Sequence, residues 1–398
     1  MNFTGILRGV PRLASGILLA VLGAALATPA RAERVYVEVD VPRSGDSVRE
    51  PINLVEVRGW AGTGLRGKHD VVIVLDRSGS TFRASGVDID GDGIVGRQFP
   101  GEPPDEIVLW TTDFGDTIVS AETLAARRLV ERLDPETTRM AIVTFGGNAK
   151  VEAPLGSSRE KLLAALDALP PWPNENGTNI YGALETAIDA FEAAPHEPGV
   201  NRQREILLLS DGVPTSPPDP PGAAQRISVH AAKNAARAHA RIYAYALGPT
   251  AAVARDRFDE IVSANGGELL VLDKPGDIVE FVPYLSWTSI AKVRLENTTN
   301  GEAGRAMRVF PDGSFDGFAP LQEGRNELRF TATSQDGTET SVTRWVSFDK
   351  TVPDPEKLAR FRKMLEVRAI ETELAERASA KREERLKKQL EVTPDTRR

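Results

Sequence analysis

The sequence predicts a doubly wound α/β domain with a mostly parallel sheet, inserted into an all-β sandwich and followed by a long charged helix. Three observations predict this arrangement. Apolar runs rich in β-branched residues alternate with helical patterns between residues 68 and 287, as in sheets covered by helices on both faces. Runs of polar and apolar alternation lie on both sides of that segment, at 33–67 and 288–350. Residues 354–392 are rich in Lys, Arg, Glu and Ala.

Residues 1–32 have the pattern of a secretory signal peptide. Arg8 and Arg12 precede the apolar stretch Leu13–Ala27, and Ala30-Arg31-Ala32 supplies small residues for cleavage. An uncleaved membrane anchor is the alternative, but the apolar stretch is short for a span. The chain contains no cysteine, so neither a lipid-modified cysteine nor a disulfide is available. We expect an exported protein, located in the periplasm rather than the medium.

The two β segments flank the α/β domain. Strand-like runs at Val35–Val41 and Leu54–Val57 enclose the turn Ser44-Gly45-Asp46, and after residue 288 further runs are separated by Gly-containing turns. Neither segment alone has enough strands for a closed core. We predict one sandwich in which the α/β domain enters near Gly62 and leaves near Ser289. Two unrelated β extensions are the alternative.

The β segments also resemble bacterial immunoglobulin-like domains. The resemblance is carried by Pro42, Gly45, Val48, Val57, Gly59, Ala61, Phe315, Leu321, Gly324, Asn326 and Leu328. It implies a sandwich whose two connections to the inserted domain are short.

The α/β domain, 68–287, is expected to alternate strands and helices after its first strand, 71–75. The predicted strands are 139–145, a short one near Val151, 206–209, 242–247 and 269–272. The predicted helices are 119–133, 159–168, 180–191, 228–240, 252–265 and 276–284. An acidic insertion occupies residues 82–116.

The C-terminal segment predicts one helix from Pro355 to Glu391, about 54 Å long at 1.5 Å per residue. Pairs such as Glu373 with Arg377 add i,i+4 support. The apolar spacing breaks between Arg377 and Arg385, which argues against a continuous coiled coil. A solvated single helix and a helix that docks on a partner or a second copy stay as alternatives.

Asp76, Ser78 and Ser80 follow the first strand of the α/β domain in LDRSGS. Alternate residues of an extended turn project to the same side, so one carboxylate and two hydroxyls can converge on a divalent cation. Taken alone, such a cluster can equally be a turn whose side chains bond their own backbone.

Two further residues strengthen the metal interpretation. Thr178 precedes a predicted helix and Asp211 ends another apolar strand in LLLSDG, and ligands of such sheets bind at the carboxyl ends of the strands. The DxSxS, Thr and SDG set resembles the metal-ion-dependent adhesion site of von Willebrand factor type A domains. That family has a doubly wound, Rossmann-like fold.

The resemblance implies how the site works. It makes Ser78, Ser80 and Thr178 the inner ligands, with Asp76 and Asp211 neutralising the ion directly or through water. Hard oxygen ligands favour Mg²⁺ or Mn²⁺. In the family a carboxylate of a partner protein completes the coordination.

The insertion contains a second candidate site. Asp88, Asp90 and Asp92 occupy positions 1, 3 and 5 of a calcium loop, Gly93 position 6, and the carbonyl of Ile94 position 7. Position 12 is Phe99 instead of Glu, so another carboxylate would have to replace it, from Glu102, Asp105 or Glu106. A calcium site and a merely acidic loop are both open.

Proline-rich loops flank the site in sequence. Pro170-Pro171-Trp172-Pro173 precedes Thr178, and Pro214–Pro221 follows Asp211. Trp172 and Trp110 are either rigid anchors for a partner or packed loop residues.

Composition narrows the function. The net charge of −8, which becomes −11 without the arginines of the leader, disfavours nucleic acid as a partner. None of the four histidines lies beside the candidate ligands in sequence, and each is expected on the surface or in a linker: His69, His196, His230 and His239. The sequence therefore favours an exported, non-enzymatic, metal-dependent protein-binding module for adhesion or assembly. A calcium-stiffened structural protein of the envelope and, less favoured, a metal-dependent hydrolase are the alternatives.

Overall fold

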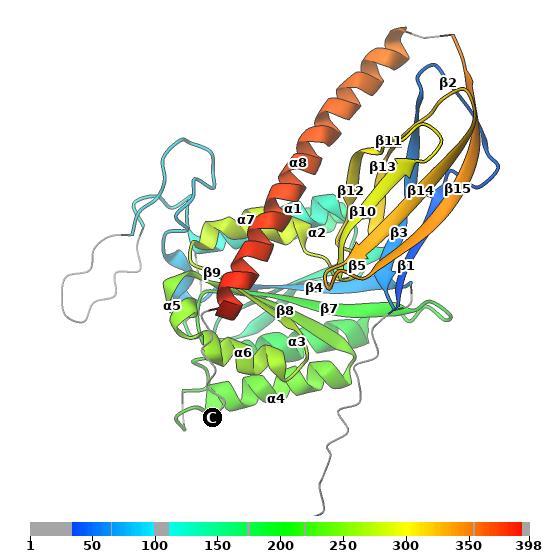
Figure 1. Cartoon of the computed structure of the whole chain (residues 1–398). Coiled ribbons are helices and arrows are strands. Elements are labelled where there is room, and N and C mark those ends of the chain that lie inside the picture. The colour runs from blue at the N-terminus through cyan, green and yellow to red at the C-terminus, as the bar shows by residue number, and fades with distance from the viewer. Residues whose placement is uncertain are drawn as a thin grey trace, which may run out of the picture. The chain divides into compact units, whose positions relative to one another are not determined.

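A computed structural model describes residues 34–64, 66–98, 111–172, 176–218, 220–352 and 355–391. The predicted signal peptide, Trp110, Phe99 and the carboxylates at Glu102, Asp105 and Glu106 lie outside these ranges. Figure 1 shows the order of the elements along the chain.

The α/β domain is built on a six-stranded sheet with the order β6-β5-β4-β7-β8-β9. All neighbouring strands pair in parallel except β6, which is antiparallel to β5. The strands are β4 (Lys68–Asp76), β5 (Thr138–Phe145), β6 (Ala149–Ala153), β7 (Arg202–Ser210), β8 (Ala240–Leu247) and β9 (Glu268–Leu272). The two neighbours of β4 in the sheet are therefore β5 and β7, and β7 carries Asp211 at its carboxyl end.

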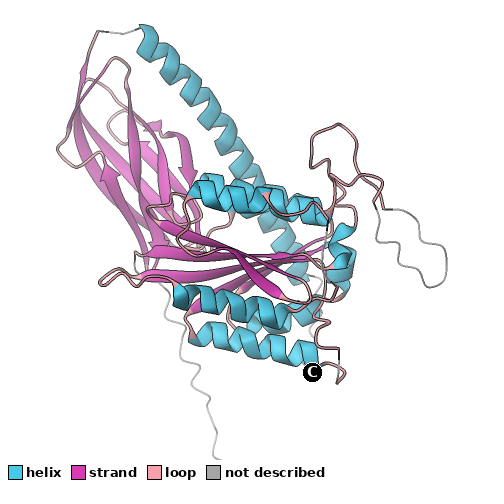
Figure 2. Cartoon of the chain, turned by 180° about the vertical axis from the view of Figure 1, so that it is seen from behind, coloured by secondary structure: helices cyan, strands magenta, loops and turns pink. Residues whose placement is uncertain are grey.

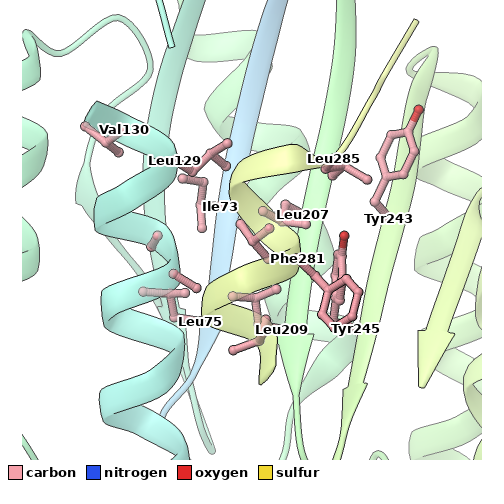
Figure 3. Packing of buried hydrophobic residues seen from close by; sticks show 14 of the residues in the cluster. Ile73, Leu75, Leu129, Val130, Leu207, Leu209, Tyr243, Tyr245, Phe281 and Leu285 are labelled. Atoms are coloured by element: carbon pink, nitrogen blue, oxygen red, sulfur yellow. The ribbon is translucent and has the colours of Figure 1, made fainter. Parts of the chain in front are cut away.

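Helices cover both faces of this sheet, as Figure 2 shows. On one face Ile73 and Leu75 pack with α1 (Ile118–Arg132), α2 (Arg159–Asp167) and α7 (Ile278–Phe281); Figure 3 shows part of this core. On the other face Val72 and Val74 pack with α3 (Ile180–Ala193), α4 (Ala223–Arg237) and α6 (Arg255–Ser263). Successive residues of β4 serve opposite cores because strand side chains alternate.

Some predicted helix limits were wrong. Helix α4 begins at Ala223, after Gly222 with a φ of 74°, and ends before His239 with a φ of 57°, so it does not reach Ala240. The region predicted as one helix at 252–265 contains α5 (Gly248–Val253) and α6. The region 276–284 is α7 between the 3₁₀ turns η2 (Pro275–Asp277) and η3 (Val282–Tyr284), since Pro283 has no N–H for a continuing α-helix.

The flanking β segments form two sheets around one apolar core. One has the order β1-β3-β13-β12 and the other β11-β10-β14-β15-β2. Their strands are β1 (Val35–Val41), β2 (Ser47–Glu50), β3 (Leu54–Thr63), β10 (Ile290–Asn297), β11 (Glu302–Ala303), β12 (Arg305–Val309), β13 (Ser314–Pro320), β14 (Gly324–Ser334) and β15 (Glu339–Lys350).

Each sheet combines strands from both sides of the α/β domain. Strand β3 pairs with β13 in antiparallel fashion, and β2 pairs with β15 in parallel. The chain leaves the sandwich after Thr63 and returns at Ile290, and the N–H of Thr63 donates to the carbonyl of Thr288 at 3.2 Å. The exit and the return are therefore held together.

Helix α8 (Pro355–Glu391) packs on the rest of the chain instead of standing alone in solvent. The ring of Phe361 meets that of Phe318 edge to face at 5.1 Å, and Arg368 forms an ion pair with Glu56 at 3.1 Å. Lys381 forms an ion pair with Glu280 of α7 at 2.7 Å. Among the described residues, none of the helices combines the length and the apolar character needed to cross a membrane.

Candidate metal site at the carboxyl edge of the sheet

The five predicted ligands lie on three segments that meet at one edge of the six-stranded sheet. Asp76 is the last residue of β4, and Ser78 and Ser80 belong to the turn that follows, which includes the 3₁₀ helix η1 (Gly79–Phe82). Asp211 directly follows β7, the neighbour of β4, and Thr178 lies two residues before α3. Because β4 and β7 are parallel, both carboxylates leave the sheet at the same end.

Hydrogen bonds connect the turn after β4 with Asp211, which follows β7. The Ser80 hydroxyl donates to Oδ1 of Asp211 at 2.7 Å, and the hydroxyls of Ser78 and Ser80 lie 3.2 Å apart. The N–H of Ser78 donates to Oδ1 of Asp76 at 2.8 Å. Four of the predicted ligands are thus placed in one hydrogen-bonded group.

Thr178 lies beside this group. Its N–H donates to the hydroxyl of Thr215 at 2.9 Å. A Cβ atom added to Gly212 would lie 3.4 Å from Oγ1 of Thr178 and 3.7 Å from Oγ of Ser80, so both hydroxyls border this glycine. The structure therefore brings all five predicted residues together.

The site concentrates negative charge away from water. Asp76, Asp211 and Glu122 are all fully or almost fully buried. Burial, and then the charge of Asp76, raises the pKa of Asp211 to about 7. Burial is also the main cause that raises the pKa of Asp76, and burial together with Asp76 and Asp211 raises that of Glu122 well above its usual range. Without a cation these carboxyl groups resist joint ionisation.

The oxygen atoms fit a hard divalent cation. Within the described part of the chain, Oδ2 of Asp211 and Oε1 of Glu122 are buried without a hydrogen-bond partner, and unpaired buried acceptors are costly. A divalent cation would favour the ionised form of these carboxylates and give the free oxygen of Asp211 a ligand bond or a bound water. Carboxylates and hydroxyls without any His or Cys favour Mg²⁺ or Mn²⁺ over softer metals.

Sequence reasoning missed two polar residues that support Asp76. Ser210 donates from its hydroxyl to Oδ2 of Asp76 at 2.5 Å, and Oε2 of Glu122 accepts the N–H of Asp76 at 2.9 Å. Glu122 was detectable, because it occupies a position on the apolar face of α1 together with Val119 and Ala126. A carboxylate in an apolar helix face points to a buried polar function.

Arg77 connects the metal strand to the proline-rich loop. Its side chain is buried, and its guanidinium donates to the carbonyls of Pro170 and of Trp172, the latter at 2.7 Å. The Trp172 side chain is 58% exposed, so it does not pack inside the loop. Of the two predicted alternatives for this tryptophan, packing is excluded.

The predicted calcium loop is a set of exposed turns closed by their own carboxylates. Asp88 accepts from the N–H groups of Gly91 and Gly93, and Asp92 accepts from the N–H of Ile94. Carboxylate oxygens of Asp88, Asp90 and Asp116 approach within 4.8 Å of one another, as do those of Asp90, Asp92 and Asp113. Asp113 and Asp116, which the sequence analysis did not name as ligands, thus join the loop.

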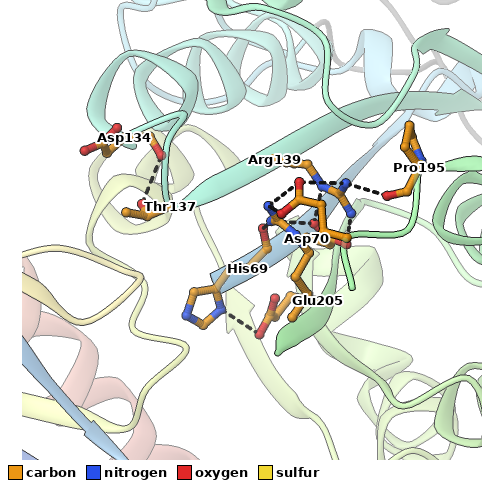
Figure 4. Close-up of polar contacts among 9 residues, drawn as sticks. His69, Asp70, Asp134, Thr137, Arg139, Pro195 and Glu205 are labelled. Carbon is orange, nitrogen blue, oxygen red and sulfur yellow. Dashed lines mark hydrogen bonds and ion pairs between the residues drawn. The ribbon is translucent and has the colours of Figure 1, made fainter. Parts of the chain in front are cut away.

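One histidine was predicted wrongly. His196, His230 and His239 are exposed, but His69 is 1% exposed at the start of β4. Its Nδ1 lies 3.0 Å from Oε1 of buried Glu205 on β7, as Figure 4 shows. Burial tends to lower the pKa of His69, but Glu205 and the backbone of Asp312 raise it by more, so the net shift is upward. This pair lies at the amino end of β4, away from the candidate ligands at its carboxyl end.

The fold and this edge define a doubly wound α/β domain whose strand ends carry a DxSxS sequence, a threonine and an aspartate. Residues 71–213 match the family model for the von Willebrand factor type A domain. This match confirms the resemblance stated from the motifs, and it locates the von Willebrand factor type A domain at residues 71–213 of the chain. The immunoglobulin-like character of the flanking segments is not established by these comparisons.

No curated protein matches the chain. Among solved structures, BatB from Bacteroides thetaiotaomicron, described as a conserved hypothetical protein, is 18% identical over 52% of this chain and 91% of its own, with a TM-score of 0.35. The von Willebrand domain of the type V pili tip protein Mfa5 from Porphyromonas gingivalis is 13% identical over 54% and 93%, with a TM-score of 0.35.

Proximal thread matrix protein 1 from the mussel byssus, solved with a zinc-occupied metal-ion-dependent adhesion site, is 20% identical over 56% of this chain and 47% of its own, with a TM-score of 0.35.

Proposed function

We propose that the chain is an exported, non-enzymatic module that binds another protein through a divalent cation held at Asp76, Ser78, Ser80, Thr178 and Asp211. The single observation that carries the proposal is the buried, unpartnered Oδ2 of Asp211, whose other oxygen is fixed by Ser80. This is a carboxylate prepared for a cation and not for another protein group. The ion is Mg²⁺ or Mn²⁺.

The roles of the five residues follow from their positions. Ser78, Ser80 and Thr178 supply hydroxyl ligands, while Asp76 and Asp211 balance the charge of the ion directly or through water. Asp76 is the more constrained carboxylate, since it accepts from Ser78 and Ser210. Because three of the five protein ligands are neutral hydroxyls and the carboxylates can act through water, a coordination position is left for a carboxylate from a partner protein.

The proposed setting is outside the cytoplasm. The signal-peptide pattern at 1–32 supports export, and the lack of cysteine is compatible with it. We place the protein in the periplasm rather than the medium. The net charge of −8 favours protein partners over nucleic acid.

The β-sandwich formed by the flanking strands supports the domain that carries the metal site. We propose that the sandwich is of the immunoglobulin-like kind and that its paired connections at Thr63 and Thr288 limit rotation of the inserted domain. A partner bound at the metal edge would then meet a surface of fixed direction.

Calcium at the acidic loop is a second proposal, and a calcium-stiffened structural protein is the alternative function. The approach of Asp113 and Asp116 to Asp88, Asp90 and Asp92 supports it, because more carboxylates become available than the loop alone offers. Here Ca²⁺ would stiffen the insertion without taking part in the Mg²⁺ or Mn²⁺ site.

The main proposal is tested by capturing partners from native extract on the immobilised chain, with Mg²⁺ or with EDTA. Proteins retained by the native chain in Mg²⁺ should be lost in EDTA and on Ser78→Ala, and retained by Ser263→Ala, which changes an exposed serine on α6. Retention of the same proteins in EDTA would contradict the proposal. Turnover of phosphoesters or peptides that stops in Asp211→Ala would instead favour the hydrolase.

A further inference from the structure

A pair of aromatic rings, one half-buried and one exposed, lies where the insertion leaves and rejoins the domain. Phe82 ends the 3₁₀ turn η1, two residues after Ser80, and its ring stacks on that of Phe114 with centroids 5.3 Å apart and 9° between the planes. Phe114 is nevertheless 57% exposed. In Figure 1 the insertion leaves the sheet at the end that carries the predicted ligands. The stack therefore fixes the direction of an apolar ring that solvent still reaches.

A second exposed aromatic residue comes from a different segment. Trp172 precedes Thr178 in the loop before α3, and its indole is 58% exposed. Its carbonyl is held at 2.7 Å by the buried guanidinium of Arg77, the residue between Asp76 and Ser78. The backbone at Trp172 is thus tied to the metal strand, which lowers the entropy lost when a partner covers the indole.

Large exposed aromatic side chains on fixed backbone are typical of the residues that dominate binding energy at protein interfaces. Here the ring of Phe114 stacks on Phe82, two residues after Ser80, and the backbone of Trp172 is bonded to Arg77, which lies between Asp76 and Ser78. These aromatic side chains offer apolar contact area next to the place where a partner carboxylate would bind the ion.

The charge around the site restricts the partner further. Asp88, Asp90 and Asp92 are exposed or half-buried in the same insertion, and Asp113 is next to Phe114. These carboxylates repel a run of acidic residues, whereas a single carboxylate bound to the cation is compensated by it.

We propose that Phe114 and Trp172 determine which partner the site accepts: a protein segment with one acidic residue beside a large apolar residue, and not a polyacidic segment. The inference rests on the proposed metal-dependent binding and adds the class of partner. It assigns a role in specificity to the two described ends of the insertion, which contain Phe82 and Phe114.

The experiment uses a bead library of peptides with a fixed central Asp and randomised flanking residues, selected on the full chain loaded with Mn²⁺. The native chain should enrich Leu, Ile, Phe and Trp next to the Asp by about tenfold over Ser and Asp, which corresponds to about 1.4 kcal/mol. Trp172→Ala and Phe114→Ser should lose this preference. Trp345→Ala, which changes a 42% exposed tryptophan of β15, should keep it.

Electron paramagnetic resonance of Mn²⁺ on the same variants measures metal binding separately from the preference for flanking residues. Unchanged Mn²⁺ binding together with lost apolar preference supports the inference. Mn²⁺-dependent capture with no preference among flanking residues, or with enrichment of Asp and Glu, overturns the inference and leaves the proposed function standing. Capture that is equal in Mn²⁺ and EDTA overturns both.

Discussion

The hydroxyl of Ser80 donates a hydrogen bond of 2.7 Å to Oδ1 of Asp211, although 131 residues separate the two in sequence. The bond joins the turn after β4 to the residue that follows the neighbouring parallel strand β7, and among the described residues Oδ2 of Asp211 is buried without a partner. One oxygen is thus positioned by the protein while the other stays available. This asymmetry leads to the first two predictions.

Mg²⁺ or Mn²⁺ should stabilise the folded chain. A ligand that binds only the folded state at about one hundred times its Kd adds about 2.7 kcal/mol to the free energy of unfolding. The rise in melting temperature should vanish in Asp76→Ala and Ser78→Ala and persist in Ser263→Ala. Differential scanning calorimetry with and without EDTA measures it, and an equal rise in Ser78→Ala would contradict the site.

Asp211→Asn should stabilise the metal-free protein at neutral pH. The pKa of Asp211 is raised from 3.8 to about 7 in the folded state, so this group makes the fold less stable as the pH rises from about 4 to 7. The amide carries no charge and can still accept from Ser80. Urea unfolding in EDTA at pH 5 and 7.5 should show a smaller loss in the variant than in the native chain.

The same variant should lose the stabilisation by Mn²⁺. If the variant loses as much stability as the native chain between pH 5 and 7.5 in EDTA, the raised pKa of Asp211 is not the source of that loss.

The pair of His69 and Glu205 should make the stability of the fold depend on pH above about 6.5, at higher pH than the carboxyl group of Asp211. The folded pKa of His69 lies above its ordinary value of 6.5, so its contribution is complete below 6.5 and is lost as the pH rises through the folded pKa. Glu205 of β7 and the backbone of Asp312 face the imidazole, and Tyr243 of β8, whose pKa is raised to about 12 by burial and by Glu205, stays neutral. Glu205→Gln should flatten the profile from pH 6 to 9. An unchanged profile would exclude the pair as its source.

Calcium should act on the insertion alone. If Asp88, Asp90 and Asp92 hold Ca²⁺, the ion raises the melting temperature of the native chain and of Ser78→Ala, but not of Asp90→Asn. Asp349→Asn, an exposed aspartate of β15, is the control. If Ca²⁺ does not change the melting temperature of the native chain, the loop is acidic but does not bind calcium.

Removal of Arg368 should loosen helix α8. Its guanidinium pairs with Glu56 and Asp316 and lies over the ring of Phe318, and its side chain is 16% exposed. Arg368→Ala should lower the free energy of unfolding by about 1–3 kcal/mol. Arg377→Ala, at a 68% exposed position of the same helix, should change it by at most about 0.5 kcal/mol. Hydrogen exchange along α8 would show whether the loss is local.

Much of the α/β domain was predictable because its signals are local. The apolar run that ends at Asp76 and the run that ends at Asp211 are buried on both sides in the sheet, and buried parallel strands read as continuous apolar runs. The ends of α4 were harder to predict from the sequence. They are set by the positive φ angles of Gly222 and His239, which residue type suggests only weakly.

The site was predictable in its ligands and not in its surroundings. The DxSxS, Thr and SDG set named five residues that the fold brings together. Ser210 was missed because it contacts Asp76 from the neighbouring strand, whereas Glu122 could have been found from its place on the apolar face of α1. His69 was expected on the surface or in a linker, and only the packing of β4 beside β7 made it a buried partner of Glu205.

The sequence by itself determined the ligand types, the strands that end in them and the long C-terminal helix, because hydrophobic periodicity and turn chemistry are properties of neighbouring residues. The tertiary structure alone decided that Asp211 keeps one oxygen free, that Trp172 is exposed while Arg77 holds its backbone, and that α8 packs on Phe318 and α7. These features depend on segments far apart in the chain, and burial and charge at such contacts exist only once the strands are assembled.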